Sequence, residues 1–123
     1  QNSEPVIRGG NDEIMEVFQN LLDNALKYSF PSSIINVEMH DNEQGQLVIN
    51  IINQGEGIKE KHIPRLTERF YRVDKGRSRQ MGGTGLGLAI VKHIINKHRG
   101  QLMISSQLNK ETIFRVTLPY LTD

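Results

Sequence analysis

A segment that is apolar on both faces is the strongest constraint on the fold of this chain. Residues 47–52, with the sequence LVINII, carry apolar side chains at odd and at even positions. A strand with one face in solvent would alternate between apolar and polar residues. Gly45 precedes the segment, and Gly55 and Gly57 follow it. We therefore expect a central strand that lies between other strands.

Three further segments have the alternating pattern of strands. Ile35, Val37 and Met39 alternate with polar residues, and the other two segments are residues 102–106 and 113–118. The last of these is expected to direct one apolar face to the core, formed by Phe114, Val116 and Leu118. Val6 and Ile7 are expected to begin one more short strand.

Helical spacing of apolar residues predicts two longer helices. The first begins at Asn11, an N-cap residue followed by Asp12 and Glu13, carries its apolar stripe from Ile14 to Ala25, and is ended by Pro31. The second runs from Leu86 to about Gly100, and a short helix is expected over residues 63–70. This order of elements predicts a two-layer α/β sandwich, with a mixed sheet covered by helices on one face.

The length and composition limit the classes of function. A chain of 123 residues fits one domain. The net charge of +1 gives no electrostatic reason to expect a nucleic-acid or membrane partner, and the absence of cysteine excludes disulfides and thiolate zinc sites. No apolar run is long enough to span a bilayer, and the beginning of the chain lacks a signal-peptide pattern. Because it begins at Gln1 rather than Met, we expect a fragment of a longer protein.

Asn20, Asn24 and Lys27 are spaced so that they form one stripe along the first predicted helix. Asparagine is unfavourable inside a helix, which suggests that Asn20 and Asn24 have a role other than forming the helix. Amide oxygens are ligands that suit Mg²⁺, and a lysine on the same stripe can bind phosphate oxygens. The alternative interpretation is a solvated polar face.

Two glycine-containing turns are the other candidate binding elements. Residues 82–87, with the sequence GGTGLG, lead into the second predicted helix, where free N–H groups form an anion site. The sequence is neither a Walker A loop nor a dinucleotide-binding turn, because it lacks the Gly-Lys-Ser/Thr ending and no strand runs directly into it. Gly55 and Gly57 would let a flat ring approach the backbone. Arginines between the two turns suit phosphate, although plain loops and a solvated face are the alternatives.

Four segments, in their order along the chain, resemble the conserved motifs, called boxes, of the ATPase superfamily of gyrase, heat-shock chaperones, histidine kinases and mismatch-repair proteins. Within it they resemble sensor histidine kinases: NLLDNALKYS at 20–29 looks like the N box, NQGEGI at 53–58 the G1 box, ERFYRVD at 68–74 the F box, and GTGLGLAIV at 83–91 the G2 box. Residues 64–72 are similar to phosphate-regulon sensor kinases. The resemblance extends over about residues 6–119.

The resemblance implies the Bergerat ATP-binding fold with a mobile ATP lid at about residues 72–84. It implies that Asn24 binds Mg²⁺ with Asn20 beside it, and that Lys27 and Arg72 contact phosphates. The residues implied to hold ATP are Tyr28, Asn53, Gly55, Gly57, Ile58, Gly83, Thr84, Gly85, Leu86 and Gly87.

The implied activity is transfer of the γ-phosphoryl group of ATP to a histidine on a separate dimerisation domain, which then passes it to a response regulator. None of His40, His62, His93 and His98 has the acidic residue and proline that follow a phosphoacceptor histidine. Residues 1–123 are therefore expected to be a cytoplasmic catalytic domain that binds ATP but does not autophosphorylate. Any membrane anchor would lie outside this chain.

The sequence departs from the family pattern at Asn53, where the G1 box normally has aspartate. An amide can donate as well as accept hydrogen bonds, so we expect weaker ATP binding and poorer rejection of GTP. Two milder departures are Thr67, where the F-box region often has phenylalanine, and the segment 109–111, where the last hairpin of the family usually carries glycines. Three alternatives stay open: a serine kinase of the anti-sigma type, a gyrase-like ATPase, and a nucleotide-binding module that has lost function. The ATPase would need a carboxylate base where this chain has Asn20, and Glu16 lies one turn further away.

Overall fold

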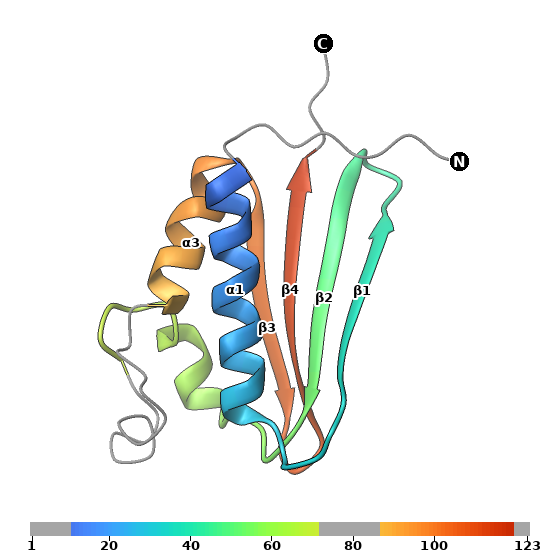
Figure 1. Ribbon diagram of the computed structural model, residues 1–123. Coiled ribbons are helices and arrows are strands. Elements are labelled where there is room, and N and C mark those ends of the chain that lie inside the picture. Colours follow the sequence, from blue (N-terminus) through green and yellow to red (C-terminus); the bar gives the residue numbers. More distant parts are fainter. Residues whose placement is uncertain (1–10, 72–86, 120–123) are drawn as a thin grey trace.

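The computed structural model describes residues 11–71 and 87–119, which form two layers (Figure 1). One layer is a sheet, and the other contains the helices, which all lie on the same face of it. This arrangement confirms the predicted two-layer α/β sandwich. The elements in chain order are α1 (Asn11–Tyr28), β1 (Ile35–Asp41), β2 (Gln46–Gln54), the 3₁₀ helix η1 (Glu60–Arg65), α3 (Gly87–Lys97), β3 (Gln101–Gln107) and β4 (Glu111–Pro119).

The sheet has the strand order β1-β2-β4-β3, so β2 and β4 are its central strands. β2 pairs with β1 on one side and with β4 on the other. This confirms the central strand predicted from the apolar residues on both faces of residues 47–52. All pairings among the described strands are antiparallel. The expectation of a mixed sheet is therefore wrong for this part of the chain, and Val6 and Ile7 lie outside the described residues.

The core lies between the inner face of the sheet and the helices. Direct register partners in adjacent strands point to the same side of a sheet, which puts Ile51 of β2 and Phe114 of β4 on the inner face. Both side chains are fully buried. α1 supplies Val17, Leu21 and Ala25, and α3 supplies Leu88, Val91, Ile94 and Ile95. Phe114, Val116 and Leu118 are all buried, which confirms their predicted common face.

The helices do not cover the sheet evenly. α1 and α3 lie over β2, β3 and β4, and the edge strand β1 is at the far side from α3 (Figure 1). The inner-face residues Val37 and Met39 are consequently 49% and 56% exposed. β1 therefore contributes hydrogen bonds to the sheet but little apolar burial.

The short helix between β2 and α3 differs from the prediction. It spans Glu60–Arg65 as a 3₁₀ helix rather than residues 63–70, and Pro64 lies inside it. Phe70 has a φ of +67°, a left-handed conformation that cannot continue a right-handed helix. No helix in the described part of the chain is long and apolar enough to cross a membrane.

Candidate functional site

The two asparagines of α1 lie beside the beginning of α3. The amide nitrogen of Asn20 donates to the Glu16 carbonyl at 3.0 Å, and that of Asn24 donates to the Asn20 carbonyl at 2.9 Å. A Cβ added to Gly87 would lie 3.2 Å from Oδ1 of Asn20 and 3.6 Å from Nδ2 of Asn24. The fold thus brings together Asn20, Asn24 and Gly87, which are far apart in the sequence.

These back-bonds fix the orientation of the two amides. An amide nitrogen only donates hydrogen bonds, so the oxygen is the atom of each side chain that can bind a cation. Carbonyl oxygens on a half-buried helix face fit Mg²⁺, which takes few protein ligands and keeps several waters. The donor set therefore fits the ion that the sequence predicts.

The end of α1 packs directly against the turn that follows β2. Ser29 forms an isolated antiparallel bridge with Gly55, and the Phe30 N–H donates to the Gln54 carbonyl at 2.8 Å. A Cβ on Gly55 would lie 1.9 Å from the Tyr28 carbonyl oxygen, so only glycine fits there. Tyr28 and Gly55 are thus neighbours, as a shared site would need. The Lys27 ammonium lies 5.6 Å from the centre of the Tyr28 ring.

Asn53 is the most unusual residue of this region. Its side chain is 0% exposed, and neither its Oδ1 nor its Nδ2 finds a hydrogen-bond partner among the described residues. An unpaired buried polar group costs about 1–3 kcal/mol, so an amide with both ends unpaired is an expensive feature. A ligand that offers one donor and one acceptor side by side would satisfy both atoms. The amino group and ring nitrogen of a purine form such an edge.

The turn around Gly57 rests on the β3–β4 hairpin. Gly57 has a φ of +84°, and a Cβ on it would lie 2.9 Å from the Gln107 carbonyl oxygen, the Leu108 Cα and the Ser106 Oγ. The Asn109 N–H donates to the Glu56 carbonyl at 2.7 Å. Ile58 directs its side chain into the core, so its contribution to a site would come from its backbone. Conformation and close packing both require glycine at position 57.

Two residues of this region, Ser106 and Thr112, were not predicted. Thr112 is 0% exposed and is the register partner of Asn53, and its Oγ1 lies 2.8 Å from the Ser106 Oγ. Both hydroxyls occupy inward-facing positions of strands whose other inward residues are apolar. A polar residue in such a pattern is the signal that could have identified them.

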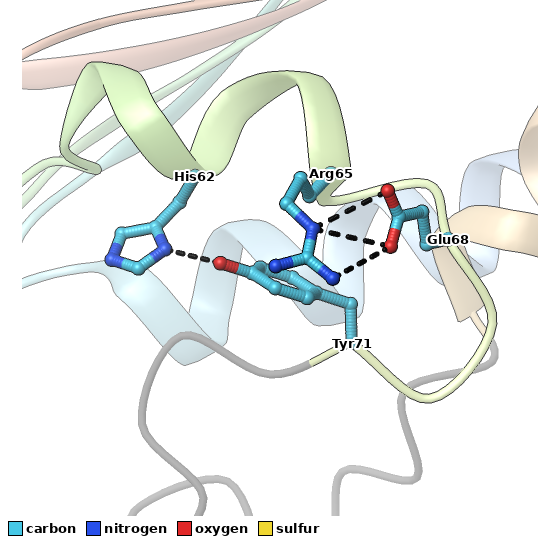
Figure 2. A network of polar contacts seen from close by, with 4 residues as sticks. All are labelled: His62, Arg65, Glu68 and Tyr71. Atoms are coloured by element: carbon cyan, nitrogen blue, oxygen red, sulfur yellow. Dashed lines mark hydrogen bonds and ion pairs between the residues drawn. The ribbon is translucent and has the colours of Figure 1, made fainter.

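The segment after η1 carries its own polar network (Figure 2). Figure 2 shows Nδ1 of His62 paired with the Tyr71 hydroxyl, and the Arg65 guanidinium paired with the Glu68 carboxylate. The guanidinium carbon of Arg65 also lies 4.4 Å from the centre of the Tyr71 ring. Hydrogen bonding to Glu68 raises the pKa of Arg65 further above its usual high value, so this arginine stays charged. The network fixes Tyr71, directly before the predicted lid.

Not every predicted residue can be located. Arg72, Gly83, Thr84, Gly85 and Leu86 lie outside the described residues, as does the whole of the predicted ATP lid. Among the described candidates, the fold forms two groups. One contains Asn20, Asn24 and Gly87, and the other contains Tyr28, Asn53, Gly55 and Gly57.

Comparison with known proteins points to one family. Residues 9–122 match the model of the histidine kinase-, DNA gyrase B- and HSP90-like ATPases. The chain is 45% identical over 108 residues to the phosphate regulon sensor protein PhoR of Pseudomonas aeruginosa, covering 88% of this chain and 24% of that protein. It is 42% identical over 110 residues to the sensor histidine kinase WalK of Bacillus subtilis, covering 89% of this chain and 18% of that protein.

The solved structures agree with this result. The mycobacterial sensor histidine kinase MprB superposes with a TM-score of 0.83 at 31% identity, covering 95% of this chain and 78% of that one. The chain spans about a quarter or less of the length of the two curated relatives named above. Nearly the whole length of the chain matches the family model, and its fold is shared with a solved sensor kinase. The chain therefore belongs to the histidine kinase-, DNA gyrase B- and HSP90-like ATPase family.

Proposed function

We propose that this chain binds Mg·ATP and donates its γ-phosphoryl group to a histidine on a separate dimerisation domain, as part of two-component signal transduction. The observation that carries the proposal is the wholly buried Asn53 amide, whose two unpaired polar atoms match a purine edge. The Asn20–Asn24 pair beside the start of α3 supports the metal and phosphate half of the same function. Similarity to named sensor kinases supports histidine as the acceptor.

The proposed roles follow the two groups of residues. Asn24, assisted by Asn20, would bind Mg²⁺, while Lys27 and Arg72 would contact phosphates. The backbone of residues 83–87 would bind the triphosphate at the start of α3. Tyr28, Asn53, Gly55, Gly57 and Ile58 would form the base site. When bound, the metal ion would neutralise phosphate charge, and these residues would orient the nucleotide for transfer.

The nucleophile would come from another domain. We propose that residues 1–123 are the catalytic domain of a longer cytoplasmic or membrane-anchored kinase, whose histidine-bearing domain would relay the phosphoryl group to a response regulator. The small share of the curated relatives that this chain covers is consistent with this division.

One experiment tests the activity. The chain is titrated with Mg·ATP and then incubated with labelled ATP, alone and with a histidine-bearing helical domain. We expect saturable binding, no self-labelling, and label on the added domain that is labile in acid and stable in base. Lack of binding would indicate a module that has lost function. Acid-stable label on a serine substrate would indicate a serine kinase, and hydrolysis abolished by Glu16→Gln a gyrase-like ATPase.

A substitution in α1 tests the metal site. Asn24→Ala removes the proposed ligand oxygen, and we expect Mg·ATP affinity to fall at least about ten-fold. Gln19→Ala is the matched control, because Gln19 lies on the exposed side of the same helix, where its amide bonds Asp23. Equal affinities of the two variants would contradict the assignment of Asn24.

A further inference from the structure

We propose that Ser106 is a positioning residue for the base site. Its hydroxyl fixes the turn after β2 to the β3–β4 hairpin and orients Thr112 beside Asn53. The inference rests on the function proposed above, because it assigns Ser106 to the half of the site that would hold the base.

The Ser106 hydroxyl joins three segments of the chain. Its Oγ accepts the Ile58 N–H at 2.9 Å, lies 2.8 Å from the Thr112 Oγ1, and lies 3.3 Å from the Glu111 carbonyl oxygen. The bond to Ile58 spans 48 positions in the sequence. One side chain therefore connects the end of the glycine turn, β3 and the beginning of β4.

The hydroxyl can exist in two arrangements of hydrogens. A serine hydroxyl has one hydrogen and two lone pairs, and the Ile58 N–H occupies one lone pair. If Ser106 donates to the Glu111 carbonyl, its second lone pair accepts the Thr112 hydrogen. If Ser106 donates to Thr112 instead, the Thr112 hydrogen is released. Thr112 could then donate to a group in the site next to its register partner Asn53.

The glycine turn depends on this contact for its position. Two backbone bonds also join the turn to the hairpin: the Asn109 N–H donates to the Glu56 carbonyl at 2.7 Å, and the Gly55 N–H donates to the Lys110 carbonyl at 3.3 Å. Without the Ser106 oxygen, the Ile58 N–H would lose its acceptor at the point where Gly57 contacts the hairpin. The turn would then shift, and it would no longer be in place beside a base that is hydrogen-bonded to Asn53.

The contacts of Ser106 predict a selective defect. They lie in the group that contains Asn53, Gly55 and Gly57, whereas the side chains of Asn20 and Asn24 lie against α1 and Gly87. Loss of the hydroxyl should weaken nucleotide binding but leave the transfer step intact once the site is saturated. A general structural role would lower both.

Ser106→Ala tests this, with Ser105→Ala as the matched control. Ser105 is the adjacent residue on the opposite, exposed face of β3. We expect the Kd for Mg·ATP to rise about ten-fold in Ser106→Ala. The transfer rate to the histidine-bearing domain at saturating ATP should stay within about two-fold of the unsubstituted chain. Ser105→Ala should change neither quantity.

Two results would overturn the inference: an unchanged Kd, or a saturated transfer rate that falls as much as affinity does. If the unsubstituted chain fails to bind Mg·ATP, the proposed function itself is wrong, so the two failures are distinguishable. Hydrogen exchange on the unsubstituted chain gives a test that needs no variant. The Ile58 amide should be protected, and exchange as fast as at an exposed loop amide would contradict its bond to Ser106.

Discussion

The amide at position 53 has chemical consequences that a carboxylate there would not have. A carboxylate accepts hydrogen bonds from the adenine amino group and repels the O6 oxygen of guanine. An amide can accept from the amino group and donate to the adjacent ring nitrogen, or turn over and donate to O6. Complete burial of Asn53 makes this choice matter, because water cannot replace a missing partner.

Asn53→Asp is accordingly expected to strengthen ATP binding and weaken GTP binding. Restoring a charge-assisted hydrogen bond contributes roughly 1–2 kcal/mol, or about ten-fold in affinity. Calorimetric titrations with Mg·ATP and Mg·GTP measure both changes. If the aspartate variant bound ATP no better than the present chain, the role given to this side chain would be wrong.

Gly57 and Gly45 separate two reasons for glycine. Both have positive φ, but a Cβ on Gly57 meets the β3–β4 hairpin, while nothing lies within 4 Å of a Cβ on Gly45. Gly45→Ala should cost about 1–2 kcal/mol of folding free energy from backbone conformation. Gly57→Ala should cost at least about 1 kcal/mol more, because the methyl group also overlaps backbone atoms. Urea denaturation of both variants measures the difference, and equal costs would contradict the packing contribution.

At this scale, sequence reasoning identifies residues whose type is unusual for their position. Asn20 and Asn24 stand out inside a helix, and Gly55 and Gly57 stand out after a buried strand. Ser106 and Thr112 carry a weaker signal, which is only that each is polar at a position where the strand pattern would place an apolar residue. Their roles depend on which segments the fold brings together, and the register of Thr112 with Asn53 cannot be read from either strand alone.

Among the elements, the long ones are predictable and η1 is not. α1 and β2 carry many residues of consistent periodicity, so their positions are fixed by the burial of a whole face. The segment 60–71 has little such pattern. Its course depends on Pro64, on the left-handed Phe70 and on the contacts of Tyr71 with His62 and Arg65. These features depend on tertiary contacts as well as on local conformation, and secondary-structure propensities describe only the local part.

The contact between α1 and α3 predicts a pH dependence of stability. The Glu13 carboxylate bonds the Lys97 ammonium at 2.8 Å and Nε2 of His98 at 3.1 Å. The Lys97 hydrogen bond is the main cause that lowers the pKa of Glu13 below its ordinary value of 4.5. The stabilisation is therefore present above pH 4.5 and is lost as the pH falls through the lowered pKa.

Glu13→Gln should give a slightly lower Tm than the unsubstituted chain at pH 7, because the pair is exposed and partly screened. The difference should shrink as the pH is lowered and disappear once Glu13 is protonated in the unsubstituted chain. Thermal scans of both proteins across this pH range measure it. A Tm difference that persisted in strong acid would show that the glutamine acts by some other means.

For the whole molecule, the two-layer architecture follows from the order of helical and strand patterns, but strand direction does not. Alternation of apolar residues shows that one face of a strand is buried; it is commoner in antiparallel than in parallel sheets but does not fix the direction of any one neighbour. No feature of the sequence indicated strand direction, so the expectation of a mixed sheet was unsupported, and the described strands are antiparallel. The sequence also does not reveal how far the helical layer extends across the sheet.

That uneven cover predicts a contrast between two residues paired across strands. Met39 of β1 and Ile49 of β2 are register partners on the same face, yet Met39 is 56% exposed and Ile49 is 2% exposed. Ile49→Ala should leave a cavity under the helices and cost about 2–5 kcal/mol of folding free energy. Met39→Ala removes side-chain atoms that are already largely in water, so we expect a cost below about 1 kcal/mol. Equilibrium unfolding of both variants in urea tests the contrast. Similar costs would mean that β1 is covered in solution, and the helical layer would then have to reach further across the sheet than Figure 1 shows.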